Sequence, residues 1–126
     1  MQIVRFKDLN FIPASHEDPK DPGVWKKILL KNTLPAGQIQ MINWARIPKG
    51  KSFAPHYHES MIEVFVMING KVKAKVVNEE TILEKGDLVV VFEKEIHTFE
   101  NISDIDVDYF AMGIATKPGG KSINVK

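Results

Sequence analysis

Residues 63–77, which read EVFVMINGKVKAKVV, decide the fold class of this chain. From residue 71 to residue 76, lysine alternates with valine or alanine, a pattern typical of a strand with one solvated and one buried face. An apolar run at residues 63–68 precedes it. The two runs are joined by Asn69-Gly70, and this dipeptide is the strongest short signal for a β-hairpin because both turn residues tolerate a positive φ. The stretch therefore predicts two adjacent antiparallel strands.

Similar short apolar runs, separated by turns rich in glycine, proline or asparagine, fill most of the remaining sequence. The predicted strands are residues 38–47, 81–83, 88–92, 96–100 and 107–115, with weaker candidates at residues 3–6 and 24–30. The run LVVVF at residues 88–92 is typical of a strand deep in a sandwich or barrel. Residues 13–23 predict a proline-rich loop, and residues 117–126 a tail or a short edge strand. No run predicts a good helix, so we expect a single all-β domain over residues 1–126.

Composition limits the class of protein. The chain has 126 residues, the size of one domain, with 44% hydrophobic residues and a formal net charge of +1. This charge balance gives no reason to expect a nucleic-acid partner. The absence of cysteine excludes disulfides and thiolate metal sites. Residues 1–11 lack the apolar region of a signal peptide and no apolar run is long enough to span a bilayer, so we expect a soluble, cytoplasmic protein with no membrane partner.

Three of the four histidines lie at predicted strand positions. His56 and His58 are two residues apart, so on one strand both side chains point to the same side, where two imidazoles can ligate one metal ion. Glu63 comes five residues after His58, and this odd step would point it the other way on a single straight strand. We therefore interpret residues 59–62 as a connector, after which Glu63 opens a new strand that faces the same interior. His97 joins this group if the sheet closes into a barrel.

The four residues form a candidate metal site. Three neutral imidazoles and one carboxylate suit a divalent transition metal, namely Fe, Mn, Ni, Co, Cu or Zn, rather than Ca or Mg, which prefer oxygen ligands. On spacing alone, two plainer interpretations stay open: His56 and His58 as a surface pair, and His97 as a structural histidine. The fourth histidine, His16, lies in the proline-rich loop beside acidic residues and is interpreted as a surface residue.

One stretch resembles the first sequence motif of the cupin superfamily. Residue for residue, the match is Gly50-x5-His56-x-His58-x4-Glu63-x6-Gly70. The resemblance implies a small, single-domain jelly-roll β-barrel of two antiparallel sheets. It also implies that His56, His58 and Glu63 are metal ligands and that the two glycines lie in turns.

A second stretch resembles the other cupin motif, with two departures. It reads Gly86-x5-Phe92-x-Lys94-x2-His97-x3-Asn101. The family usually has proline in place of Phe92 and glycine in place of Lys94, so we expect Lys94 to adopt an unusual φ. The resemblance implies that His97 is the fourth metal ligand and that Asn101 makes a structural Asx-type turn bond.

Four protein ligands around an ion that prefers six leave two positions open for water, dioxygen or a bidentate substrate. Glu63 is the candidate catalytic residue, as a general base. Side-chain parity favours Phe65, Met67 and Phe99 as walls of the substrate pocket, with plain barrel core as the other interpretation. Arg46 is a candidate for binding a substrate carboxylate, or else a solvated residue.

The resemblance implies a range of functions. The first hypothesis is a metal-dependent enzyme, either an oxygenase or an isomerase/lyase, that acts on a small polar molecule. The alternative is a non-catalytic protein of the same fold that binds or senses a small molecule. A third interpretation, a storage-like or structural barrel, is disfavoured by the intact ligand set. No helix-turn-helix pattern supports DNA binding. Small cupins resemble one another in pairing through edge strands, so we expect a homodimer with residues 1–11 as the donor segment.

Overall fold

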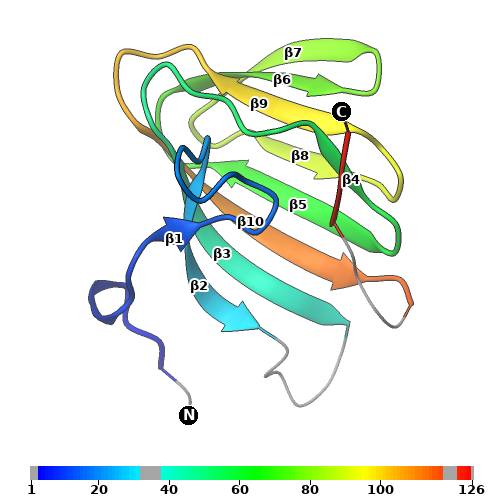
Figure 1. Ribbon diagram of the computed structural model, residues 1–126, viewed down its shortest axis with the longest axis horizontal. Helices are drawn as coiled ribbons and strands as arrows, with labels where there is room; N and C mark the ends of the chain where they lie inside the picture. The colour runs from blue at the N-terminus through cyan, green and yellow to red at the C-terminus, as the bar shows by residue number, and fades with distance from the viewer. Residues whose placement is uncertain (1–2, 32–37, 118–121, 126) are drawn as a thin grey trace.

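The protein folds into two antiparallel β-sheets that enclose the core between them, as a computed structural model shows (Figure 1). The structure describes residues 3–31, 38–117 and 122–125. The start of the N-terminal donor segment and residues 118–121 and 126 of the expected tail lie outside the described residues. No helix in the described part of the chain has the length and apolar character needed to cross a membrane.

One sheet has six strands in the order β1-β2-β3-β10-β5-β8, and the other has five in the order β11-β4-β9-β6-β7. The strands of the six-stranded sheet are β1 (Ile12–Pro13), β2 (Trp25–Lys31), β3 (Ile39–Ile47), β5 (Met61–Met67), β8 (Leu88–Val91) and β10 (Val107–Ala115). Those of the five-stranded sheet are β4 (His56–His58), β6 (Lys71–Val76), β7 (Glu79–Glu84), β9 (His97–Asn101) and β11 (Ser122–Asn124). A short 3-10 helix, η1 (Phe6–Asp8), precedes them.

The all-β prediction is confirmed, and the strand expected at residues 107–115 has the predicted bounds. Residues 3–6 are an exception, since they form no strand and lead into η1. Barrel closure is a second difference. Among the described residues, no hydrogen-bonded pair of strands connects the six-stranded sheet to the five-stranded sheet, so the arrangement is an open sandwich of two sheets.

The prediction of a hairpin at Asn69-Gly70 is wrong. The two strands beside this turn belong to different sheets, since β5 pairs with β8 and β10 while β6 pairs with β7 and β9. Gly70 has the positive φ that the turn signal requires, at 68°. The Asn69 side chain accepts a hydrogen bond from the backbone N–H of Asp108 on β10, at 2.7 Å. The turn therefore carries the chain from one layer to the other, and the true hairpin is β6–β7, whose loop holds Val77 at a φ of 56°.

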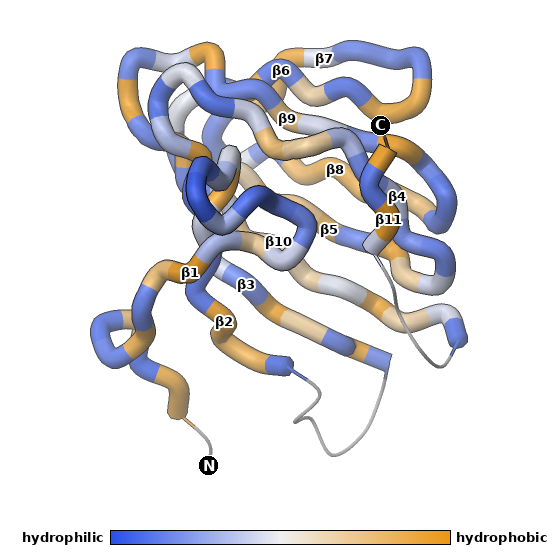
Figure 2. The backbone as a smooth tube through the Cα atoms, in the orientation of Figure 1, coloured by the Kyte–Doolittle hydropathy of each residue, from blue (hydrophilic) through white to orange (hydrophobic). Residues whose placement is uncertain are grey.

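The strand expected deep in the fold at residues 88–92 instead lies at the edge of the six-stranded sheet, where Figure 2 shows hydrophobic residues along β8. Leu88 is 57% exposed and Val90 is 37% exposed. The opposite face of β8 packs on the core, where Val91 is buried. The run is therefore apolar on a buried face and on an exposed face. A continuous apolar run alone therefore did not distinguish a central strand from an edge strand.

The structural role expected for Asn101 is confirmed. Its side-chain oxygen accepts a hydrogen bond from the N–H of Ser103 at 2.8 Å, which is the Asx-type turn. Its side-chain nitrogen donates to the carbonyl oxygens of Ile47 and Ile105 at 3.0 and 2.8 Å. Asn101 therefore fixes the end of β9, the strand that begins with His97.

Candidate metal centre

The four predicted ligands converge between the two sheets. His56 and His58 lie on β4 and His97 on β9, in the five-stranded sheet, whereas Glu63 lies on β5 in the six-stranded sheet. His56 and His97 are direct partners across β4 and β9. One potential ligand atom from each of the four residues lies within 4.8 Å of the other three, and all four residues are buried. The group has the composition and the spacing of a metal site that joins the two sheets.

The change of sheet explains the odd step from His58 to Glu63. Strand β5 begins at Met61, so the connector consists of residues 59–60 and is shorter than expected. Every second residue of β5 from Met61 onward is buried, Glu63 included. The prediction that two strands meet in this stretch, with Glu63 facing the same interior, is confirmed.

The turn before His97 shows how the chain accommodates its departures from the second motif. Lys94 has a φ of 64°, as expected for a residue at the usual glycine position. Its backbone N–H donates to the carbonyl oxygen of His58 at 2.7 Å, which ties this turn to β4. Phe92 is 56% exposed, and its N–H donates to the Glu95 carboxylate at 2.7 Å. The turn is thus held by its own polar contacts.

Backbone carbonyls orient two of the imidazoles. Nδ1 of His56 lies 2.8 Å from the carbonyl oxygen of Ala54, and Nδ1 of His97 lies 3.0 Å from that of Glu95. A carbonyl oxygen only accepts, so each Nδ1 carries the proton and each Nε2 has a free lone pair. This is the tautomer in which a metal-binding histidine is usually held by its outer partner.

The third imidazole is oriented by the C-terminal strand. Nδ1 of His58 lies 3.1 Å from the hydroxyl oxygen of Ser122 on β11. A hydroxyl accepts from an N–H as readily as it donates, so it is compatible with the same tautomer. The expected edge strand in the tail is therefore confirmed at β11, and it brings a polar partner to the site.

Three buried atoms of the site have no hydrogen-bond partner: Nε2 of His58, Nε2 of His97 and Oε1 of Glu63. They nevertheless lie close together, with Glu63 Oε1 at 2.5 Å from His58 Nε2 and 3.3 Å from His97 Nε2. These contacts are short but do not have the geometry of a hydrogen bond, so lone pairs face one another. Buried polar groups of this kind need a partner. A cation among them supplies it, and the residues therefore fit a metal ion.

The surroundings favour the protonation state that binds metal. Burial, with smaller effects from the neighbouring His16 and His97, lowers the pKa of His56 to about 3, so this ring is neutral near pH 7. Burial alone would raise the pKa of Glu63, but the contacts with His58 and His97 outweigh it and hold that pKa well below its ordinary value. A neutral imidazole and an ionised carboxylate are both ready to donate to a metal.

A cavity of about 540 Å³ lies beside the ligands, lined on one side by His56, His58 and Glu63. Ala45 on β3 and Ala111 on β10 line it as well. Their small side chains leave this space in a region that larger residues would fill. A molecule in the cavity would thus contact the ligand group directly.

Comparison with known proteins agrees with this geometry. A family model described as a cupin domain matches residues 43–113, more than half of the chain. The chain belongs to the cupin domain family. None of the curated proteins compared with it matches significantly. The fold of this cupin is shared by solved structures of low sequence identity.

Three of these structures carry different functional names. A predicted oxalate decarboxylase from Thermotoga maritima is 21% identical with a TM-score of 0.79, and the match covers 90% of this chain and 99% of that one. The polyketide cyclase RemF from Streptomyces resistomycificus is 16% identical with a TM-score of 0.78, covering 100% and 86%. A sugar phosphate isomerase from Silicibacter pomeroyi is 16% identical with a TM-score of 0.78, covering 99% and 82%. At these identities the likeness shows the fold alone.

The structure separates the four residues expected to contact a substrate. Phe65 lines the cavity, whereas Met67 and Phe99 belong to the buried core and do not line it. Arg46 also lies outside the lining, because alternate residues of β3 face outward. Its guanidinium donates two hydrogen bonds to the Asp108 carboxylate, at 2.7 and 2.9 Å. Arg46 is therefore neither a cavity residue nor a free solvated one.

The interpretation of His16 as a surface residue is wrong. Its ring stacks on His56, with centroids 3.9 Å apart and planes inclined by 20°, and it lines the cavity. Its Nδ1 lies 2.9 Å from Glu17, whose carboxylate also accepts from the N–H groups of Ala54 and Gly23 at 2.9 and 2.7 Å. A proline-rich loop has no periodicity that shows which way a side chain faces. The sequence therefore offered no signal for this placement.

We expect Ser122→Ala to weaken the affinity for a divalent transition metal about tenfold or more, because loss of an outer partner of a metal-binding histidine usually costs about 10–100-fold. Titration against a chromophoric chelator measures the affinity. Ser52→Ala, at an exposed position, is the matched control and should leave it unchanged. Equal affinities for Ser122→Ala and the parent protein would show that Ser122 does not support His58.

Proposed function

We propose that this cupin binds a divalent transition metal through His56, His58, Glu63 and His97 and is a metal-dependent enzyme. The observation that carries the proposal is a set of three buried atoms that can ligate a metal. They lack hydrogen-bond partners and face one another. The substrate is a small polar molecule held in the adjoining cavity. The reaction belongs to the oxygenase or the isomerase/lyase class.

Imidazole nitrogen and carboxylate oxygen suit Fe, Mn, Ni, Co, Cu or Zn. When bound, such an ion supplies Lewis-acid or redox chemistry to a molecule in the cavity. The chain itself contributes the orientation of the imidazoles and a proton acceptor. Glu63 is the candidate acceptor, through Oε2, because both of its histidine contacts use Oε1.

The names of the similar structures support this range of chemistry, since they include a predicted decarboxylase, a cyclase and an isomerase. A non-catalytic protein that binds or senses a small molecule is the second candidate. The cavity supports this alternative as well, because binding alone needs a lined volume beside polar groups.

Protein expressed without a histidine tag should carry nearly one transition-metal ion per chain, as measured by elemental mass spectrometry. His58→Ala should lose most of it, because the site then lacks one of its four ligands. Tyr57→Phe, between the two β4 ligands, is the control and should keep the metal. The proposal fails if untagged protein is metal-free and also refuses added Fe, Mn and Zn.

Catalysis and binding differ in the fate of the small molecule. We expect the metal-loaded protein to convert a component of a metabolite extract in molar excess over the protein, as followed by mass spectrometry, and His58→Ala to convert none. Recovery of an unchanged compound in a one-to-one ratio would instead favour the binding protein. Repeating the reaction without dioxygen separates an oxygenase, which stops, from an isomerase or lyase, which continues.

We also propose that the protein forms a homodimer through the outer face of the six-stranded sheet. The exposed side chains of Leu88 and Val90 on β8 pair in register with Val66 and Val64 on β5. They form an apolar patch at the β8 edge of this face, and a symmetric contact between two copies would bury the same patch on both.

The N-terminal segment that we expected to act as a donor packs, in its described part, on its own chain. The ring of Phe6 lies 5.0 Å from that of Trp44, and Lys27 donates to the Phe6 carbonyl oxygen at 2.9 Å. Light scattering should return the mass of a dimer for the parent protein and of a monomer for Val90→Glu. A monomer mass for the parent protein would contradict the proposal.

A further inference from the structure

The wall of the cavity formed by β2 contains two lysines that the metal site does not use. Lys26 pairs with Ala45 and Lys31 with Met41 of β3, with a register shift between Ile28 and Leu30. A regular strand that points Lys26 inward would point Lys31 outward. The β-bulge reverses this, and both lysines line the cavity. Bulges that re-aim a side chain are common next to active sites.

These two ammonium groups have no anionic partner in the part of the chain that the structure describes. The lysines found in ion pairs there are Lys51, Lys71 and Lys73. Burial and the nearby charge of Lys31 lower the pKa of Lys26, against a smaller opposing effect of Glu63. Two cations in one cavity wall repel each other, and an anion bound between them would relieve both the repulsion and the lost hydration.

Asn43 provides a second unused group in the same cavity. It is 7% exposed, and its Oδ1 is buried without a hydrogen-bond partner. Its Nδ2 lies 3.0 Å from the sulfur of Met41. A thioether sulfur accepts weakly and cannot donate, so this orientation of the amide is the favoured one. Oδ1 is therefore left to accept a hydrogen bond from a hydroxyl or amine of a molecule in the cavity.

The placement of these groups sets the shape of the ligand. The order of strands is β2-β3-β10-β5, so the strands that carry the lysines and Glu63 are three strand spacings apart, roughly 14 Å between their backbones along the sheet. Between them, Ala45 and Ala111 form a low floor, with Asn43 beside Ala111 in register. An elongated molecule can thus lie across the alanines, with its ends at the ligand group and at the lysines.

We propose that the substrate is a small hydroxylated molecule with an anionic oxygen group, a carboxylate or a phosphate, that binds Lys26 and Lys31 while a hydroxyl donates to Asn43 Oδ1. The far end of the molecule faces the metal ligands. This inference rests on the proposed function, because it takes the cavity to be the substrate site. A neutral molecule of the same length would leave the lysines unpaired and bind more weakly.

Calorimetric titration with three probes tests the proposal. The probes are 2-hydroxyglutarate, 2-hydroxyglutaramide, in which neutral amides replace both carboxylates, and 3-phosphoglycerate, which carries a phosphate. We expect 2-hydroxyglutarate or 3-phosphoglycerate to bind at least tenfold more tightly than 2-hydroxyglutaramide, and the tighter of the two identifies the anionic group. Equal binding of all three probes, or no binding of either anionic probe, would overturn the proposal.

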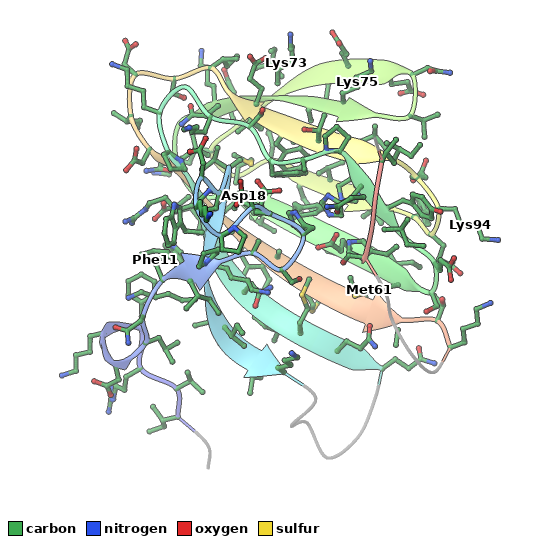
Figure 3. All side chains as sticks on the ribbon, viewed as in Figure 1. Phe11, Asp18, Met61, Lys73, Lys75 and Lys94 are labelled. Carbon is green, nitrogen blue, oxygen red and sulfur yellow. The ribbon has the colours of Figure 1, made fainter. Side chains whose placement is uncertain are left out.

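Variants show whether the lysines cause this preference. Lys26→Met should remove it and Lys26→Arg should retain it. Lys75→Met is the matched control, because Lys75 projects from the outer side of β6, far from the cavity wall (Figure 3), and should change nothing. If Lys26→Met does not fold, Lys31→Met at the exposed rim of the cavity tests the proposal instead. We expect it to lower the affinity for the anionic probes about threefold or more. An unchanged preference in these variants would overturn the proposal.

Two further arms complete the design. Asn43→Leu should weaken the binding of 2-hydroxyglutarate. It should leave the binding of glutarate, which lacks the hydroxyl, unchanged. An equal effect on both would remove Asn43 from the proposal. All titrations are run on chelator-treated and on metal-loaded protein. If no metal binds, the preference in chelator-treated protein still tests the lysine wall, whereas a metal-loaded protein without the preference overturns only the anion site.

Discussion

The buried contact of Glu63 with His58 and His97 is the constraint on which the rest of this structure depends. It brings a carboxylate from one sheet against imidazoles from the other, at 2.5 and 3.3 Å, without completing a hydrogen bond. Such an arrangement is costly when left unpaired. The outer contacts of the histidines hold their lone pairs toward the same point rather than relieving this cost. A cation bound between the two sheets would therefore stabilise these lone pairs.

Sequence reasoning reached the parts of this arrangement that local rules specify. Strand parity predicted that His56 and His58 face the same side, and the resemblance to the cupin motifs predicted the full ligand group and an unusual φ at Lys94. It failed where a local signal does not determine the partner. An Asn-Gly turn fixes the direction of the chain, but it does not say which sheet each flanking strand joins, and Asn69-Gly70 joins two sheets. The apolar run in β8 likewise fits an edge as well as a centre.

The cavity was the least predictable part, because its lining depends on irregular backbone. Lys31 faces inward only because of the β2 bulge, and a bulge resets the parity on which the prediction of facing residues relies. His16 reaches His56 from a loop without any period. Arg46 was a reasonable candidate by residue type, but its position on β3 directs the side chain outward, where it binds Asp108. Parity arguments are therefore sound within a regular strand and fail across its interruptions.

The contact between Ser122 and His58 spans 64 positions of the chain. His56 and His97 meet only when β4 and β9 pair, so no local segment contains the ligand group. Contacts between distant segments form late in folding, because the entropy of closing the chain is lost first. The proposed metal site is therefore complete only after both sheets have assembled. Because β11 is a three-residue edge strand, its detachment would remove Ser122 from His58, and the exchange of a metal bound there would report local opening of the fold.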